Sequence, residues 1–179
     1  PGLRSYIATS KYVDGLPLYR QAKMLQRIDM ELSRSTLSHW MIKLGILIQP
    51  LINLLRDYLL ASGYVQMDET TVQVLNEKDR PASSKSYMWV QRSSSPGCNI
   101  ILFDYDPTRK QEVPERLLEG FSGYLQTDAY AGYNLVGSRD EIIMLACWAH
   151  ARRKFDEAVK ALGKKGKNRP GRAQKALSF

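Results

Sequence analysis

Cysteine is scarce in this sequence, and long apolar runs are missing from it. The 179 residues include two cysteines, Cys98 and Cys147, which cannot build a disulfide framework and are typical of a reducing interior. No apolar run reaches the roughly 18 residues that a membrane-spanning helix needs, and we expect no signal peptide. The sequence therefore excludes a disulfide scaffold and favours a protein with no membrane partner.

Positive charge is what the composition has in excess. Lysine and arginine number 26 against 18 aspartates and glutamates, which gives a formal net charge of +8 and a sequence pI near 9.5. This surplus favours a polyanion partner, with nucleic acid ahead of an anionic membrane. Hydrophobic residues (44%) and charged residues (25%) stand at ordinary globular levels, and the length suits one or two domains. The chain starts with Pro-Gly and stops within a basic stretch, so we expect both ends to belong to a longer protein.

Residues 1–62 predict a helical segment. Apolar residues recur at helical spacing in 18–28 and again in 37–44, and Ser33 or Ser35 can cap the second helix. Two helices joined by a short break resemble a helix-turn-helix, although an ordinary helical hairpin fits the same pattern. In a helix-turn-helix the second helix lies in the major groove of DNA. Its outward-facing, DNA-binding residues would be Arg34, Ser35, Thr36, Ser38, His39 and Lys43.

From residue 63 onward the pattern predicts an α/β (α+β) domain with a mixed sheet. Strands are expected at 64–75, 87–92, 99–105, 124–128 and 142–147. Tight connections make the first three strands an antiparallel meander, and a helix ending at Gly120 precedes the fourth. A last helix over 149–162 would turn Phe155 and Val159 inward. Residues 164–179 are expected to form a basic linker or the start of an interrupted helical region.

In two of the expected strands, a short run of strand-like residues ends in aspartate. The segments YVQMD, ending at Asp68, and YLQTD, ending at Asp128, share a Tyr-apolar-Gln-x-Asp pattern. Ligand sites gather at strand ends, and two neighbouring carboxylates repel unless a proton or a divalent cation lies between them. The pair therefore predicts a Mg²⁺ phosphoryl-transfer site, although Asp68 alone could merely start a turn. Side chains alternate along a strand, so we expect Glu69 on the opposite face and not as a ligand.

Five blocks in order carry a family resemblance: SKYVDGLPLYRQ, ELSRSTLSHWM, MDET, GYLQTDAYAGYN and CWAHARRKFDEA. Over nearly all of residues 9–163 the chain resembles the central part of the transposase of the insertion-sequence-66 family. The resemblance implies a helix-turn-helix-like segment (1–62) and an incomplete ribonuclease-H-like core (63–163) flanked by helices, whose first and fourth strands lie side by side. It also implies double-stranded DNA (transposon ends and target) as partner, a homo-oligomer in the active complex, and a bacterial, cytoplasmic, nucleoid-associated location.

The resemblance further implies a DDE-class site, in which two aspartates and a glutamate hold two Mg²⁺ (or Mn²⁺) ions for DNA strand cleavage and joining. Asp68 and Asp128 match the two aspartates. The family's glutamate lies in a later helix within an Asn-Asn-x-x-Glu context that is absent here, and Glu157 does not match it. We therefore expect the third carboxylate outside this chain, and this chain alone to be inactive.

Two alternatives to a transposase fragment remain open. One is a catalytically inactive remnant that binds DNA as a module. A weaker one is another ribonuclease-H-like nuclease, such as a resolvase, against which the CWAHARRKF block argues.

Several residues near the last expected strand could assist the site. Cys147-x-x-His150 has the spacing of half a zinc site, but a second half is missing, so we expect no zinc and a packed Cys147. His150 could still approach the cleft as an auxiliary residue. Tyr130, beside Asp128, could stack on an unpaired base or simply cover the sheet edge. Phosphate contacts are expected from Arg152, Arg153 and Lys154.

Overall fold

The chain folds into two compact units. The computed structural model describes residues 2–95, 98–161 and 171–177. The N-terminal unit is Pro1–Leu54 and the C-terminal unit is Leu55–Phe179, so the boundary falls within helix α4 (Gln49–Leu60).

The N-terminal unit is helical, as the sequence predicted. Its helices before α4 are α1 (Gly2–Tyr12), α2 (Leu18–Gln26) and α3 (Arg34–Leu47). Their small core buries Ile7, Leu25, Leu37 and Met41. Ser33 caps α3, because its side-chain oxygen accepts a hydrogen bond from the backbone N–H of Thr36 at 3.0 Å. The two helices expected from apolar spacing, α2 and α3, are therefore present.

Helix α1 was not predicted, because its residues show little apolar periodicity. Tertiary contacts stabilise it instead. Ile7 is fully buried, and the buried side chain of Gln21 donates to the carbonyl oxygens of Ile7 (3.2 Å) and Leu16 (3.0 Å). One side chain of α2 thus ties α1 and the following loop together, which local propensity cannot reveal.

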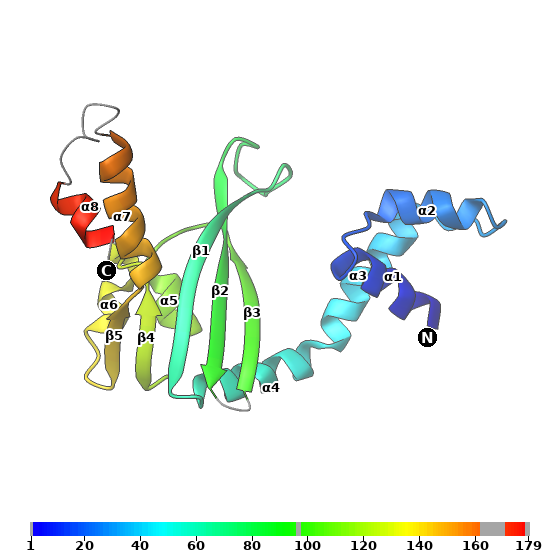
Figure 1. Ribbon diagram of the computed structural model, residues 1–179. Helices are drawn as coiled ribbons and strands as arrows, with labels where there is room; N and C mark the ends of the chain where they lie inside the picture. The colour runs from blue at the N-terminus through cyan, green and yellow to red at the C-terminus, as the bar shows by residue number, and fades with distance from the viewer. Residues whose placement is uncertain (1, 96–97, 162–170, 178–179) are drawn as a thin grey trace. The chain divides into compact units, whose positions relative to one another are not determined.

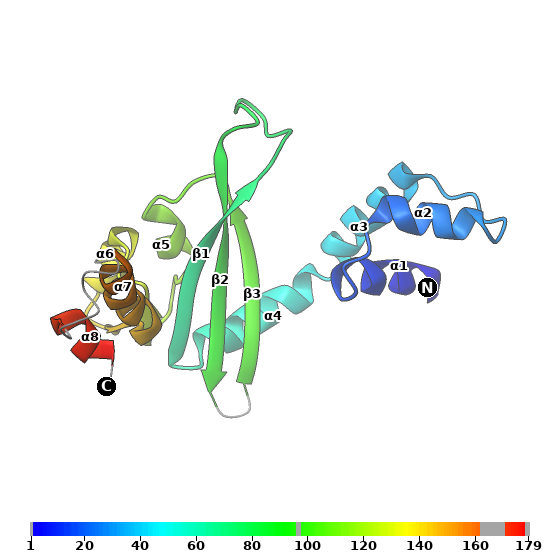
Figure 2. The ribbon, with the colours of Figure 1, turned by 45° about the horizontal axis from the view of Figure 1, so that its top comes forward.

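The C-terminal unit is built on a five-stranded mixed sheet in the order β3-β2-β1-β4-β5 (Figure 1). The strands are β1 (Tyr64–Gln73), β2 (Lys85–Ser95), β3 (Cys98–Asp106), β4 (Gly123–Thr127) and β5 (Ile142–Ala146). The first three form the expected antiparallel meander, running side by side in Figure 2. β4 pairs in parallel with both β1 and β5. This is the ribonuclease-H-like order, and it confirms that the first and fourth strands are neighbours.

The sheet of this unit shares one hydrophobic core with several of the helices around it. The remaining elements are α5 (Glu112–Leu117), the 3₁₀ turn η1 (Ala131–Tyr133), α6 (Asn134–Gly137), α7 (Trp148–Ala161) and α8 (Arg172–Leu177). Val65, Met67, Trp89 and Leu125 of the sheet are buried together with apolar residues of α4 and α5. Within the described residues, no helix has both the length and the apolar character that crossing a membrane would require.

Helix α7 differs from expectation. Its apolar residues were expected to face inward, but α7 has no buried residue, and Phe155 is 42% exposed. Its contact with α8 leaves Val159 only half-buried. Of the expected basic segment 164–179, residues 164–170 and 178–179 lie outside the described residues, and Arg172–Leu177 forms α8 beside α7.

A close backbone approach sets the start of the β1–β4 pairing. Gly123 has φ of 128°, a conformation that glycine adopts easily and other residues do not. A Cβ atom at this position would lie 2.3 Å from the carbonyl oxygen of Gly63. That same oxygen accepts a hydrogen bond from the backbone N–H of Tyr124 at 2.9 Å. Only glycine fits here without separating the two strands.

We predict that Gly123→Ala lowers the free energy of unfolding by at least about 2 kcal/mol, because it combines a backbone clash with a strained φ. Urea unfolding followed by tryptophan fluorescence, to which the buried Trp89 contributes, measures the change. Gly45→Ala is the control: it lies in α3 with open space around it, so alanine should add about 0.5–1 kcal/mol of helix stability. Equal stability of Gly123→Ala and the unmodified chain would contradict the prediction.

Candidate functional site

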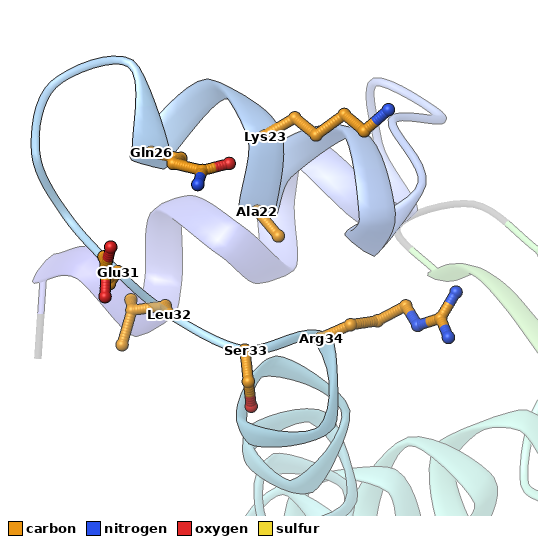
Figure 3. A pocket seen from close by; sticks show the side chains of 7 residues that line it. All are labelled: Ala22, Lys23, Gln26, Glu31, Leu32, Ser33 and Arg34. Carbon is orange, nitrogen blue, oxygen red and sulfur yellow. The ribbon is translucent and has the colours of Figure 1, made fainter.

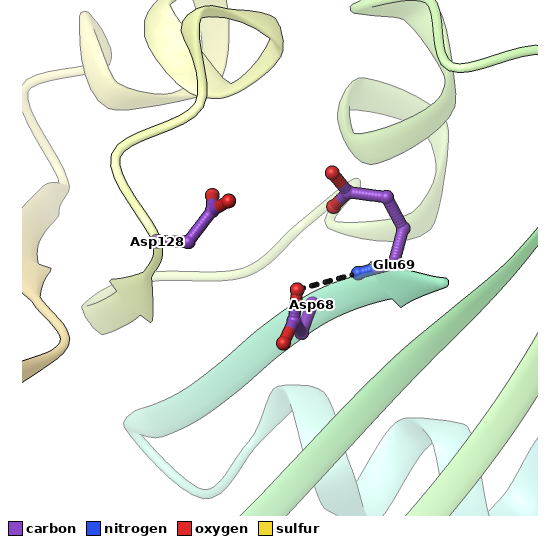
Figure 4. A group of neighbouring side chains, drawn as sticks. All are labelled: Asp68, Glu69 and Asp128. Carbon is purple, nitrogen blue, oxygen red and sulfur yellow. Dashed lines mark hydrogen bonds between the residues drawn. The ribbon is translucent and has the colours of Figure 1, made fainter. Parts of the chain in front are cut away.

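The two predicted aspartates meet at one edge of the sheet. Asp68 lies within β1, and Asp128 follows the last residue of β4. β4 pairs in parallel with the first residues of β1 and ends beside the middle of that longer strand, so Asp128 lies near Asp68, while β1 itself continues to Gln73. One carboxylate oxygen from each of Asp68, Glu69 and Asp128 lies within 4.8 Å of the others (Figure 4). The expected juxtaposition is therefore present, with a third acidic residue beside it.

Asp68 is the open member of this carboxylate cluster. Its side chain is 58% exposed. One oxygen, Oδ1, accepts a hydrogen bond from the backbone N–H of Glu69 at 2.9 Å, and Oδ2 lies 4.0 Å from Nε2 of His150. A carboxylate held this lightly keeps lone pairs available for a ligand.

Asp128 is held more firmly, by the turn that follows it. Its Oδ1 accepts a hydrogen bond from the backbone N–H of Tyr130 at 2.9 Å, and its side chain is 22% exposed. The intervening Ala129 has φ of 65°, a left-handed conformation that is uncommon for residues with a Cβ. The surrounding structure offsets this local strain, and the turn fixes the direction in which the Asp128 side chain points.

Glu69 was expected on the opposite face of β1 from Asp68, and Figure 4 shows the two side chains leaving the strand on opposite sides. Its proximity to Asp128 was not foreseen. The Glu69 side chain is fully buried, with Oε1 accepting from Nε of Arg109 at 2.6 Å and Oε2 from the hydroxyl of Tyr133 at 2.6 Å. It reaches the cluster because a glutamate is long and Asp128 lies beyond the end of β4, where face alternation no longer applies.

Arg109 joins this cluster from the loop before α5. Its guanidinium forms an ion pair with Glu69, lies 3.9 Å from Oδ2 of Asp128 and stacks 3.6 Å from the ring centre of Tyr130. The hydroxyl of Tyr130 donates to the backbone oxygen of Arg109 at 2.9 Å. Burial acts to lower the pKa of Arg109, but the hydrogen bond and charge of Glu69 outweigh it and raise that pKa, so the guanidinium stays charged. No sequence pattern marked Arg109 as a site residue.

Tyr133 contacts Glu69 through its hydroxyl group, which donates to Oε2. Burial raises the pKa of its hydroxyl, and the hydrogen bond to Glu69 raises that pKa further, so the hydroxyl remains a donor. The ring packs edge-to-face against Trp89 and Tyr130, with centroid distances of 6.0 and 6.2 Å. Tyr130 is thus part of the sheet-edge packing and supports Arg109.

A cavity of about 240 Å³ opens on the Asp68 side of the sheet. Its lining includes both aspartates, Arg92, Cys147 and His150. His150 therefore approaches the cleft, as the sequence suggested. Its Nδ1 is buried without a hydrogen-bond partner among the described residues.

The residues expected to bind DNA lie at the surface of their own units. Arg34, Ser35, Ser38, His39 and Lys43 are exposed on α3, whereas Thr36 is half-buried and its hydroxyl is 2.9 Å from that of Ser33. A hollow of about 480 Å³ between α2 and the start of α3 has Lys23 and Arg34 on its two sides (Figure 3). On α7, the side chains of Arg152, Arg153 and Lys154 are exposed.

Comparison with solved structures adds little to the fold assignment. The chain is similar to a chain in the cryo-EM structure of the simian T-cell lymphotropic virus intasome in complex with PP2A regulatory subunit B56 gamma. Sequence identity is 12%, the TM-score is 0.38, and the match covers 65% of this chain and 46% of that one. The fold assignment therefore rests on the strand order.

Comparison with other sequences is more decisive. Three uncharacterized proteins of Sinorhizobium fredii are similar to this chain: y4qI is 38% identical over 86% of it, y4jD 31% over 90%, and y4hP 27% over 88%. The chain spans 30% to 34% of the lengths of these relatives. A family model described as "Transposase IS66 family" matches residues 1–178. Together with the ordered sequence blocks and the paired aspartates, this match shows that the chain belongs to the IS66 family of transposases.

Proposed function

We propose that this chain supplies the first two carboxylates of a DDE-type site that cleaves and joins DNA strands at the ends of an insertion sequence. The observation that carries the proposal is the meeting of Asp68, within β1, and Asp128, just after the neighbouring parallel strand β4. Family membership supports DNA as the substrate, and the net charge of +8 is consistent with it.

The donor set fits Mg²⁺ or Mn²⁺. Both ions prefer hard oxygen ligands, and Asp68 and Asp128 offer carboxylate oxygens beside an open cavity. Asp68 and Asp128 would hold the ions, which when bound activate the attacking oxygen and stabilise the leaving one. The chain's own part is positional: the turn at Ala129 and the Tyr130 N–H orient Asp128, while Asp68 stays exposed to the cavity. No zinc enters this proposal.

The third carboxylate is proposed to come from outside these 179 residues. Glu69 lies within the cluster, but both of its oxygens are already engaged by Arg109 and Tyr133. The relatives are about three times as long as this chain, which leaves ample sequence for a further ligand.

DNA contacts are proposed for two surfaces, each within its own unit. The exposed polar and basic side chains of α3 are suited to phosphates and base edges, as in a helix-turn-helix. Arg152, Arg153 and Lys154 on α7 would contact phosphates. Cleavage and joining of two transposon ends further suggests a homo-oligomeric active complex. His150, 4.0 Å from Asp68, is an auxiliary candidate.

A DNA-binding module without chemistry is the second candidate, and one observation favours it. Within the described part of the cluster, both oxygens of Glu69 accept side-chain hydrogen bonds, so two carboxylates, Asp68 and Asp128, remain open to a cation. DNA binding without cleavage under any divalent metal, in a protein of full family length, would establish this alternative.

We predict that Asp68→Asn or Asp128→Asn lowers Mg²⁺-dependent cleavage of transposon-end DNA at least about 100-fold in a full-length family protein carrying this sequence, because each change removes a metal ligand. Thr70→Ala is the control, since Thr70 is exposed on the Asp68 side of β1 but outside the cluster. Retained activity in either asparagine variant would show that the site has been misassigned.

We also predict that Arg34→Ala and Lys43→Ala each weaken DNA binding and reduce the slope of log affinity against log salt by about one unit. The physical reason is the loss of one phosphate contact in each variant. Fluorescence anisotropy at several salt concentrations measures both quantities. Lys78→Ala removes the same charge from the exposed β1–β2 loop, so its slope should stay unchanged. Equal slopes for all three variants would rule out α3 as the DNA-binding helix.

A further inference from the structure

Glu69 has the chemistry of a metal ligand but the surroundings of a structural residue. Its side chain is 0% exposed, against 58% for Asp68 and 22% for Asp128. A buried carboxylate is costly unless it is paired and hydrogen-bonded, and Glu69 is both. Arg109 engages Oε1 and the Tyr133 hydroxyl engages Oε2. Each oxygen keeps a second lone pair, but the positive charge of Arg109 in contact with Oε1 opposes a cation at this carboxylate.

Arg109 stands between two carboxylates. It is in direct contact with Glu69, while its Nη2 lies 3.9 Å from Oδ2 of Asp128. Attraction between opposite charges grows as their distance falls, so Glu69 holds the guanidinium against the weaker pull of Asp128. The ring of Tyr130 under the guanidinium, and the hydrogen bond from Tyr130 to the Arg109 backbone, fix the plane in which it lies.

We infer that Glu69 is the counter-charge that keeps Arg109 off Asp128, and that it is not itself a metal ligand. This inference rests on the proposed function, because it assigns Glu69 and Arg109 as positioning residues for the metal-binding aspartates. Without the charge of Glu69, the nearest carboxylate to Arg109 is Asp128, and an Arg109–Asp128 ion pair would compete with a cation for the same oxygens. The Glu69–Arg109 ion pair thereby leaves the carboxylate of Asp128 available to bind a cation.

Charge removal in two steps tests this inference, with Mn²⁺ as the probe and the whole chain as the sample. Glu69→Gln keeps the shape and the hydrogen bonding to Tyr133 but frees Arg109, so we expect Mn²⁺ binding to weaken at least about 10-fold. The double variant Glu69→Gln/Arg109→Gln removes the competitor as well, so binding should return to within about threefold of the unmodified chain. Electron paramagnetic resonance of free Mn²⁺ gives the affinities, and thermal unfolding confirms that each variant is folded.

A different outcome for the double variant would overturn the inference about Glu69. If Glu69 is a metal ligand, the double variant stays as weak as Glu69→Gln, and the inference is overturned. Should Glu69→Gln fail to fold, the double variant decides alone, because the two accounts predict opposite affinities for it. Asp128→Asn tests the proposed function separately: if it binds Mn²⁺ as tightly as the unmodified chain, the metal site itself is wrong, whatever Glu69 does.

A second measurement needs no substitution. In the unmodified chain, the Arg109 Nε–H signal in a nitrogen-15 NMR spectrum reports its hydrogen bond to Glu69. We expect this signal to keep its position and its slow exchange with solvent as Mg²⁺ is added. The backbone amide signals of Asp68 and Asp128 should shift. Loss of the signal on Mg²⁺ binding would mean that Glu69 has left Arg109 for the metal.

Discussion

The parallel pairing of β1 with β4 is the constraint on which the site depends. Tyr64 pairs with Tyr124 and Gln66 with Gln126, and each aspartate follows four residues after its paired tyrosine. A slip of one residue in this register would turn one carboxylate to the opposite face of the sheet. The side chains of Gln66 and Gln126 reinforce the register, since they share a hydrogen bond of 2.8 Å across the two strands.

Much of this arrangement could be predicted from the sequence, because it follows from local patterns. Alternating apolar residues marked the strands, and the repeated Tyr-apolar-Gln-x-Asp pattern marked the two aspartates. Face alternation also placed Asp68 and Glu69 correctly on opposite sides of β1. The neighbouring position of the first and fourth strands came from the family resemblance, and the structure confirms it. Periodicity alone could not order strands separated by a helix and long connections.

The parts that could not be predicted depend on contacts between distant residues. Arg109 lies 40 positions after Glu69, and nothing in its own segment distinguishes it from a surface arginine. Tyr133 is 64 positions from Glu69. Helix α1 likewise depends on Gln21, 14 residues after Ile7. Helix α7 shows the reverse error, in which the sequence predicted burial that the structure lacks. Its apolar stripe predicted a buried face, but none of its residues is buried. An amphipathic pattern marks a face suited to burial without specifying which surface covers it.

The charges of the cluster explain why a basic chain would need a cation at this point. Arg109 contacts Glu69 directly and lies 3.9 Å from Asp128, and its single positive charge leaves the three carboxylates of the cluster with a net negative charge. In the proposed function, this negative charge would repel a DNA phosphate that the net charge of the chain, +8, would attract. A divalent cation held by Asp68 and Asp128 would offset that repulsion. Under the proposed function, pairing Glu69 with Arg109 would keep a third negative charge from deepening this repulsion and would keep the arginine from the position proposed for the cation.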